Sequence, residues 1–419
     1  MSRWIEVGTP MKRMLLALAI VSALFLSSPP LQAQAPAASA SAKATADKPA
    51  CAPAAGLTFI CGLQNPEDLV LVPGTRWLLT SGMAPGAGLN VVDTQTKGVR
   101  TLYAPDTANA RADRARFANC PGPLDPKQAV LHGLALRSAA GGRYTVYATN
   151  HGGRESVEVF ELSVGPASPK RGFEPSREGG SGGAVGIPSA TWIGCVLLPP
   201  KLAANSVAAF SDGTLVATVL MLPGRTFEDA FAMRNTGIVL QWTPGTPAFV
   251  ELKGTELVAN NGIETSPDDR EFYVASTPTR RVYAFSRAKP GAGPLRFAQL
   301  KDFGPDNVRW TSAFAKATAD KADNRLITAG LIDDEPACGG RPKDEKGIRC
   351  PMGYAVATID PKTMIATEIA RGQRTPSFTG TAMAAVVGNE LWLGSFLADR
   401  LAYRPLDVAR GRPLKGDAR

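Results

Sequence analysis

Short apolar segments that alternate with turns dominate the sequence from residue 57 onward. The segments at residues 69–72 and 76–80 are separated by Pro-Gly-Thr, and those at 262–265 and 271–275 are separated by Ser-Pro-Asp-Asp-Arg. Runs of about 4–8 residues bounded by Gly, Pro, Asn or Asp are typical of β-strands joined by tight turns. The pattern therefore predicts an all-β chain built from short antiparallel strands.

A unit of strand, turn, strand, loop and strand occurs six times, with starts near residues 67, 132, 205, 261, 306 and 380. A repeated antiparallel unit of about 40–70 residues cannot bury both of its faces alone, which is typical of propeller blades. The sequence thus predicts a six-bladed β-propeller, with a β-sandwich as the alternative. A propeller, unlike a sandwich, gathers the innermost strand starts around one axial hole. The residues expected there are Glu67, His132, Asn205, Asn261, Asp306 and Thr381.

Oxygen-bearing side chains occupy several of these predicted strand starts. Glu67 and Asp68 are adjacent, and the first basic residue after them is Arg76. Two acids at the mouth of an apolar strand are costly unless a positive charge compensates them. Calcium takes about 6–8 oxygen ligands, so oxygens that converge from several strands suit this ion. The sequence therefore predicts a central calcium site, with further oxygens from Asn205, Asn261, Asp306 and Asn307.

Composition agrees with this architecture and limits the classes of binding partner. The chain has 419 residues with 42 Gly and 34 Pro, which fits many strands joined by turns. Its net charge of +9 is scattered, and no dense basic block is interleaved with aromatic residues. The charge therefore indicates a soluble surface and does not predict nucleic-acid binding.

The N-terminal residues have the features of a secretory signal peptide. Lys12 and Arg13 precede an apolar run at 15–26, and Ala33-Gln34-Ala35 forms a cleavage site. The run is shorter than the roughly 20 apolar residues that a transmembrane helix needs. We expect an exported protein, periplasmic or secreted, without a membrane anchor after cleavage. Either Met1 or Met11 serves as the start.

Composition also divides the chain into four predicted regions. These are a signal peptide at 1–35, an Ala/Pro-rich disordered linker at 36–56, the propeller at 57–406 and a polar tail at 407–419. Residues 165–190 are rich in Gly, Ser, Pro and Arg, which predicts a mobile surface loop. The heptapeptide at 315–321 repeats residues 42–48. We interpret it as a tolerated insertion on the outer turn of a blade.

Six cysteines permit 15 pairings, and export makes disulfides permissible. Cys338 and Cys350 bracket a polar loop and are the favoured pair. Cys51 with Cys61, and Cys120 with Cys195, are further candidates. The alternative is that some of these cysteines are free and buried.

An ordered set of motifs resembles the paraoxonase/arylesterase family over residues 57–406. The motifs are Pro-Glu-Asp-Leu (66–69), Leu-His-Gly-Leu (131–134), Thr-Asn-His (149–151), Asn-Ser-Val-Ala-Ala (205–209), Ala-Asn-Asn-Gly-Ile-Glu-Thr-Ser-Pro-Asp (259–268) and Asp-Asn-Val (306–308). The resemblance implies a six-bladed propeller that acts as a calcium-dependent lactonase and esterase. Gluconolactonase-like propellers are related and also bind their metal through an acidic residue and asparagines, but they lack the paired histidine motifs.

The resemblance also implies roles for individual residues. The catalytic calcium would be held by Glu67, Asn205, Asn261, Asp306 and Asn307. The two histidines of the chain, His132 and His151, match the family's channel histidine and its partner in the second layer.

Three departures from the family pattern change what is expected. A second, structural calcium would use Asp68, but the family's other acid is replaced by Ser206, so this site should be weak or empty. Arg404 stands at the position of the family's C-terminal cysteine, so closure of the ring must rest on strand pairing by residues 57–61. The segment at 220–237 is shorter than the family's active-site lid.

These observations lead to one functional expectation with two alternatives. We expect calcium-dependent hydrolysis of lactones, aryl esters or both. Calcium would polarise the carbonyl group, His132 would take a proton from water, and His151 would orient His132. The alternatives are a gluconolactonase-like sugar lactonase and a non-catalytic exported propeller with structural calcium. The expected partner is a small-molecule lactone or ester, and the sequence does not indicate an oligomeric state.

Overall fold

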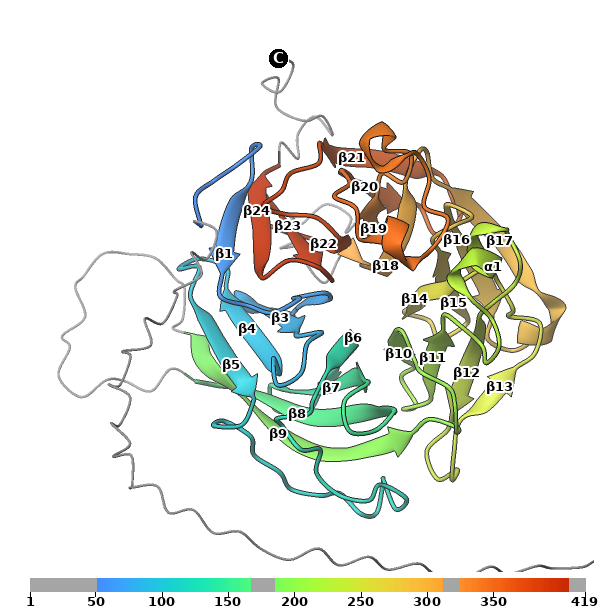
Figure 1. Ribbon diagram of the computed structural model, residues 1–419. Coiled ribbons are helices and arrows are strands. Elements are labelled where there is room, and N and C mark those ends of the chain that lie inside the picture. The colour runs from blue at the N-terminus through green and yellow to red at the C-terminus, as the bar shows by residue number, and fades with distance from the viewer. Residues whose placement is uncertain (1–50, 167–184, 312–323, 407–419) are drawn as a thin grey trace, which may run out of the picture. The chain divides into compact units, whose positions relative to one another are not determined.

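The computed structural model describes residues 51–166, 185–311 and 324–406. In these residues, six four-stranded antiparallel sheets form a ring around a central axis (Figure 1). The predicted all-β, six-bladed propeller is therefore confirmed. The signal peptide, the linker before residue 51, the heptapeptide at 315–321 and the tail at 407–419 lie outside the described residues.

Each sheet is ordered from an innermost strand at the axis to an outermost strand at the rim. The first blade comprises β2 (Leu69–Leu71), β3 (Trp77–Ser81), β4 (Leu89–Asp93) and β5 (Val99–Tyr103). The second comprises β6 (Leu131–Ala139), β7 (Arg143–Asn150), β8 (Ser156–Pro166) and β9 (Val185–Leu197). The third comprises β10 (Val207–Ala209), β11 (Leu215–Val219), β12 (Ile238–Trp242) and β13 (Val250–Leu252).

The other three blades follow the same order. The fourth comprises β14 (Asn260–Thr265), β15 (Glu271–Ser276), β16 (Arg281–Ser286) and β17 (Pro294–Gln299). The fifth comprises β18 (Gly304–Trp310), β19 (Leu326–Leu331), β20 (Tyr354–Ile359) and β21 (Ala366–Gly372). The sixth comprises β22 (Thr381–Val387), β23 (Glu390–Ser395), β24 (Arg400–Pro405) and β1 (Thr58–Cys61). The short helices are α1 (Phe227–Phe231), η1 (Pro290–Ala292), η3 (Pro336–Cys338) and α2 (Glu345–Ile348).

The ring closes by pairing the two ends of the propeller. β1 lies antiparallel to β24, with Thr58 opposite Tyr403 and Cys61 opposite Arg400. Figure 1 shows these strands side by side although they lie at opposite ends of the chain. The prediction that residues 57–61 close the ring is confirmed. The pairing covers the edge of β24 that would otherwise be free, and β1 becomes the outer strand of the sixth sheet.

The sequence pattern located the inner strands but missed most outer ones. The outermost strands β5, β13, β17 and β21 have largely exposed or half-exposed side chains. Such strands lack the apolar run that marks a buried strand. The predicted loop at 165–190 is also too long, because β8 continues to Pro166 and β9 begins at Val185.

Three disulfides are present in the described part of the chain. They join Cys51 to Cys61, Cys120 to Cys195 and Cys338 to Cys350, with Cα–Cα distances of 6.0, 5.2 and 5.8 Å. All three predicted pairings are confirmed, and all three distances lie in the usual range for disulfides. Disulfides persist in oxidising compartments, which agrees with the expected export.

None of the helices in the described ranges is long and apolar enough to span a membrane.

Candidate functional site

The candidate site is built at irregularities in the inner strands. The pairing register shifts between Leu131 and Leu134 in β6, between Asn260 and Ile263 in β14, and between Pro305 and Val308 in β18. His132, Asn261, and the pair Asp306–Asn307 fall within these three shifts. A β-bulge interrupts the ladder and changes where a side chain points. The bulges therefore free these polar residues from the regular in-and-out alternation of a strand.

A glycine follows two of these residues and lets neighbouring blades approach at the axis. A Cβ atom at Gly133 would lie 2.6 Å from Ser206 Cα, and one at Gly262 would lie 2.5 Å from Asn307 Cα. Neither position has room for a side chain. The short distance between inner strands is what brings oxygens from different blades together.

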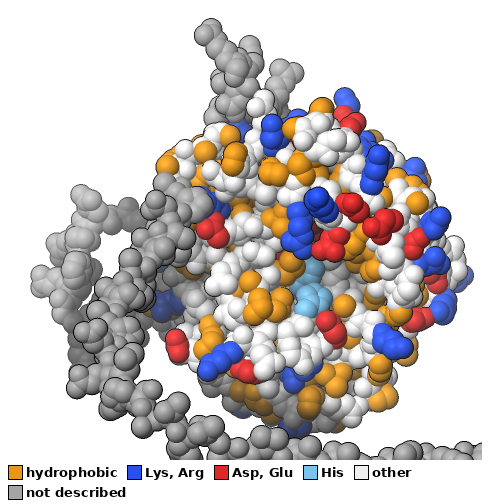
Figure 2. Space-filling model, viewed as in Figure 1, with side chains coloured by type: hydrophobic (Ala, Val, Ile, Leu, Met, Phe, Trp, Pro, Cys, Tyr) orange, Lys and Arg blue, Asp and Glu red, His pale blue; other side chains and the backbone are white. Residues whose placement is uncertain are grey.

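Five of the six predicted axial residues line a single cavity of about 410 Å³: Glu67, His132, Asn205, Asn261 and Asp306. Thr381, the sixth, begins β22 and is buried, but it is not part of the cavity wall. Figure 2 shows histidine side chains (pale blue) near the middle of one face of the molecule, beside hydrophobic and acidic side chains.

The oxygens at the bottom of the cavity lack hydrogen-bond donors. Within the described residues, three side chains that line the cavity have a buried oxygen without a partner: Glu67 Oε2, Asn205 Oδ1 and Asn261 Oδ1. Asn307 Oδ1 is also buried and unpartnered, on a residue that contacts Glu67 but is not part of the cavity wall. Two of the amide nitrogens form hydrogen bonds: Asn307 Nδ2 donates to Glu67 Oε1 at 2.5 Å, and Asn261 Nδ2 donates to Thr277 Oγ1 at 3.0 Å. Buried polar atoms are normally satisfied. This set of oxygens therefore fits a hard cation such as calcium.

Negative charge is concentrated at the same point. The side chains of Glu67 and Asp68 are 1% and 0% exposed. Burial, and then the charges of Glu67 and Asp68, raise the pKa of Asp306 well above its ordinary value. Burial likewise raises the pKa of Asp68 to about 6, against the opposing effect of Arg309. Glu67 and Asp306 line the cavity, and two carboxyl groups so placed favour a bound cation.

A chain of side chains runs from the cavity toward the surface of the second blade. His132 Nε2 lies 3.6 Å from Glu67 Oε1, and His132 Nδ1 lies 3.0 Å from His151 Nε2. His151 Nδ1 in turn lies 2.9 Å from Glu155 Oε2. The structure thus joins the two predicted histidines. Sequence reasoning missed Glu155, although an acid four residues after His151 is a visible signal.

The charge state of His132 reflects opposing effects. Burial lowers its pKa, while the nearby carboxylates of Glu67, Asp68 and Glu155 raise it, so the pKa lies above the ordinary 6.5. A cation bound among these carboxylates would offset the negative charge that raises the pKa of His132. The imidazole of His132 is therefore neutral more readily when the oxygen set holds a metal ion.

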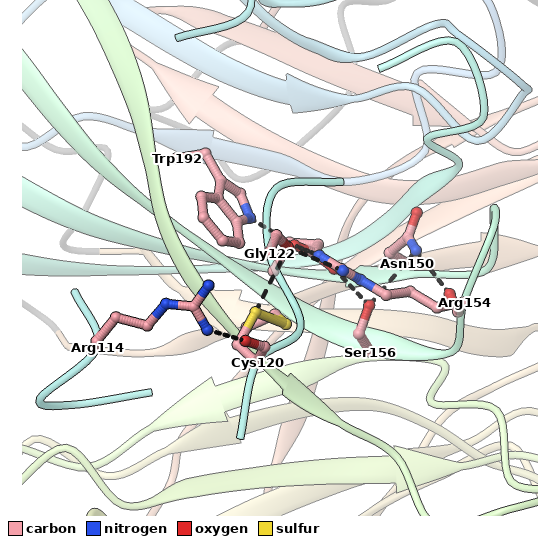
Figure 3. Close-up of a disulfide and its surroundings, with 9 residues drawn as sticks. Arg114, Cys120, Gly122, Asn150, Arg154, Ser156 and Trp192 are labelled. Carbon is pink, nitrogen blue, oxygen red and sulfur yellow. Dashed lines mark hydrogen bonds and ion pairs between the residues drawn. A yellow bond between two sulfur atoms is a disulfide. The ribbon is translucent and has the colours of Figure 1, made fainter. Parts of the chain in front are cut away.

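A buried network fixes the loop that carries His151 (Figure 3). Asn150 Nδ2 donates to the carbonyl oxygens of Gly152 and Arg154 at 3.0 and 2.7 Å. Arg154 forms an ion pair with Glu158, which is 0% exposed, and donates to Gly122 O at 2.9 Å. Gly122 lies two residues after Cys120, whose disulfide to Cys195 ties this segment to β9. The loop carrying His151 and Glu155 is therefore held on several sides.

Two short helices form the rim of the cavity. α1 begins with a capping box between Thr226 and Asp229 and contributes Phe227 and Phe231 to the wall. α2 lies within the loop that the Cys338–Cys350 disulfide closes, and Ile348 lines the cavity. The segment at 220–237, shorter than the lid of the paraoxonase family, thus provides only one side of the rim. The other side comes from a disulfide-closed loop to which the sequence reasoning gave no role at the site.

The rim and upper wall are largely apolar. Their apolar side chains are Met83, Leu220, Phe227, Phe231, Ile348, Phe396 and Leu397, and the charged ones are Asp333, Glu345 and Arg349. The cavity therefore combines a polar floor with a mainly hydrophobic mouth.

Asp68 does not line this cavity and has a different partner. Its carboxylate accepts hydrogen bonds from Leu69 N at 2.8 Å and Leu134 N at 2.7 Å, and it forms an ion pair with Arg309. Ser206 Oγ is buried and, among the described residues, has no hydrogen-bond partner.

Comparison with protein families finds a match over part of the chain. The model described as "SMP-30/Gluconolactonase/LRE-like region" matches residues 191–317. This region contains Asn205, Asn261, Asp306 and Asn307 but neither histidine. No curated protein matches the chain. The chain is therefore similar in part to gluconolactonase-like propellers, and its resemblance to paraoxonases stays a prediction.

Several solved structures resemble this chain at low sequence identity. A gluconolactonase, XC5397 from Xanthomonas campestris, is 14% identical with a TM-score of 0.43, over 84% of this chain and 89% of that chain. The allergen Mala s 1 of Malassezia sympodialis is 12% identical with a TM-score of 0.47, over 85% and 97%. Regucalcin, a calcium-binding protein from Agrobacterium tumefaciens, is 11% identical with a TM-score of 0.43, over 83% and 92%. Similarities at this level do not assign an activity.

Proposed function

We propose that this protein is a calcium-dependent lactone hydrolase. The observation that carries the proposal is the set of unpartnered oxygens on Glu67, Asn205 and Asn261 in a cavity that also contains His132. The unpartnered oxygen of Asn307, whose amide nitrogen donates to Glu67, adds to this set. These residues and Asp306 would hold the calcium ion. The partial match to a gluconolactonase-like family supports lactones as the substrate class.

A calcium ion bound at the floor would polarise the substrate carbonyl and stabilise the oxyanion that forms during hydrolysis. Glu67 and Asp306 supply the negative charges that bind it, and the three asparagines supply neutral oxygens. Hydrogen bonds hold the amide nitrogens of Asn261 and Asn307, so their oxygens are already oriented. Preorganised ligands lose little freedom on binding.

His132 is proposed to accept the proton of the attacking water. For His132 Nε2 to accept a proton, His132 Nδ1 must carry a hydrogen and donate it to His151 Nε2, 3.0 Å away. His151 Nδ1–H then donates to Glu155 Oε2 at 2.9 Å. One assignment of hydrogens thus satisfies every ring nitrogen except the one that faces the cavity. Glu155 and His151 act as positioning residues, because they set the tautomer of His132.

The walls of the cavity favour a substrate with an apolar group. The side chains of Leu220, Phe227 and Phe231 lie on one side of the mouth, and Ile348 lies on the rim formed by α2. Such side chains gain free energy when an acyl chain or ring covers them. A lactone with an alkyl side chain would place its carbonyl on the polar floor and its chain along this wall.

The test is hydrolysis of alkyl-substituted lactones, aryl esters and sugar lactones, with calcium and with chelator. We expect lactone hydrolysis that chelator abolishes and calcium restores. His132→Gln should lower kcat by about 10²–10⁴, the usual contribution of a general base. Glu161→Gln serves as a control, since Glu161 pairs with Arg111 and Arg143 away from the cavity. Full lactonase activity in chelator would contradict the proposal.

A sugar lactonase is the second candidate, because the matched family region is gluconolactonase-like. Sugar lactones carry several hydroxyl groups, which need polar partners. Asp333, Glu345 and Arg349 are the charged side chains near the mouth. If sugar lactones show the higher kcat/KM, these residues contact the hydroxyl groups. If alkyl lactones show it, the apolar wall determines specificity.

A further inference from the structure

A buried arginine occupies the axis of the propeller. Arg309 lies near the end of β18, and its side chain is 4% exposed. It does not line the candidate site. It borders a second cavity of about 310 Å³, which is lined by residues further along the same inner strands, including Arg137, Glu264 and Trp310. A charge at such a place requires compensation by several oxygens.

The guanidinium of Arg309 is bonded to oxygens from several blades. Nη2 pairs with Asp68 Oδ2 and donates to Leu134 O at 2.5 Å. Nη1 donates to Ile263 O at 2.9 Å and to Val308 O at 2.8 Å. Asp68 precedes β2, while Leu134, Ile263 and Val308 lie on β6, β14 and β18. One side chain therefore connects four of the six innermost segments.

A carboxylate and backbone carbonyls around one positive centre are also what calcium binds in proteins. In this chain those oxygens are already engaged by the guanidinium. A planar group with five donors can bridge several acceptors, which the compact ammonium of a lysine does less well. Ser206 Oγ nearby is unpartnered, but both carboxylate oxygens of Asp68 are engaged, unlike the oxygens of the candidate site.

The charge balance agrees with this assignment. Asp68 is the only carboxylate that hydrogen-bonds Arg309 in the described structure. Ser206, which neighbours this position, is neutral: a Cβ at Gly133, the residue before Leu134, would lie 2.9 Å from Ser206 Oγ. Asp68 and Arg309 form a hydrogen-bonded pair of opposite charges, and the charge of Glu264, which lines the second cavity, also favours the guanidinium.

We propose that Arg309 is a built-in replacement for a second cation in the axial channel. Asp68 then binds Arg309 rather than calcium, and each chain binds one calcium ion at the candidate site. The expected number of one calcium ion per chain rests on the proposed function, but the proposal that Arg309 replaces a second cation does not. A covalently attached cation differs from a metal ion because chelator cannot remove it.

The experiment counts calcium ions bound per folded chain by isothermal titration calorimetry and by metal analysis after gel filtration. The parent should bind one. The double variant Arg309→Ala with Ser206→Asp removes the guanidinium and adds an acid, so it should bind one more ion than the parent. Arg137→Met is the matched control: Arg137 donates to Ala209 O and Thr265 Oγ1 in the second cavity and does not contact Asp68. It should leave the count unchanged.

A second measurement covers the case in which the double variant does not fold. Arg309→Met keeps most of the volume but removes the charge. It should lower Tm by the same amount in calcium and in chelator, because the lost interaction involves no metal. A drop confined to the calcium condition would overturn the proposal.

The outcomes separate this inference from the proposed function. Two calcium ions in the parent would overturn the role of Arg309 and leave the lactonase proposal intact. No calcium in the parent would overturn the calcium site of the proposed function. In that case one added calcium ion in the double variant would still support the proposal that Arg309 replaces a second cation. A folded double variant that binds the same number of calcium ions as the parent would overturn that proposal.

Discussion

Glu67→Gln should have opposite effects on thermal stability in calcium and in chelator. The substitution keeps the size of a side chain that is 1% exposed but removes its negative charge. With calcium present, the parent is stabilised by binding. At a free calcium concentration of about 100 times Kd, this contribution is about 2.7 kcal/mol. The variant loses a charged ligand and most of that contribution.

The magnitude follows from the size of the propeller. With an unfolding entropy of about 2.1 cal/mol/K per residue, roughly 350 residues give about 0.7 kcal/mol/K. A loss of about 2.7 kcal/mol therefore lowers Tm by about 4 °C. Without calcium the sign reverses, because the charge of Glu67 opposes the ionised forms of Asp68 and Asp306. Removing this charge should therefore raise Tm in chelator.

Scanning calorimetry of parent and variant, each in calcium and in chelator, measures both signs. Glu161→Gln is the control and should give the same difference from the parent in both conditions, since its partners Arg111 and Arg143 lie outside the cavity. If Glu67→Gln lowers Tm equally in calcium and in chelator, Glu67 is only a structural hydrogen-bond acceptor. The calcium assignment of the floor oxygens would then fail.

The other predictions concern the histidine pair, the rim and the network beneath them. His132→Gln should retain the calcium-dependent rise in Tm while kcat falls by about 10²–10⁴, and unchanged turnover would refute the base assignment. Replacing Cys338 and Cys350 together by serine should raise KM for alkyl lactones without changing calcium affinity, because α2 belongs to the rim and not to the floor. Arg154→Met leaves the fully buried carboxylate of Glu158 without its ionic partner, at a cost of about 3–5 kcal/mol. Chemical denaturation should show this loss, and Arg154→Met with Glu158→Gln should recover part of it.

Local patterns in the chain were sufficient for the fold. Segments such as 69–72, 271–275 and 354–359 are apolar and end at turn residues, so they indicate strands wherever they lie in space. Their sixfold recurrence indicates blades, and the ring then requires that residues 57–61 pair with the last strand, as they do. The outer strands were not predicted because their side chains face solvent, so their sequences lack the apolar run that marks a buried strand.

The candidate site was predictable in its membership but not in its construction. Glu67, Asn205, Asn261 and the pair Asp306–Asn307 were selected by motif, and the structure brings these residues together at the axis. Glu155 was overlooked because an acid beside a histidine on a loop is common. The rim from α2 was overlooked because the Cys338–Cys350 loop is far from the motifs along the chain.

The partner of Asp68 illustrates what only the tertiary structure decides. In the sequence, Arg309 lies 241 residues from Asp68 and looks like one more scattered basic residue. The bulges in β6, β14 and β18, together with glycines that allow close approach, determine which oxygens meet at the axis and which receive the guanidinium. Strand patterns depend on neighbours along the chain, whereas the ligands of a charge depend on distances of a few ångströms between blades. Those distances exist only after the ring has closed.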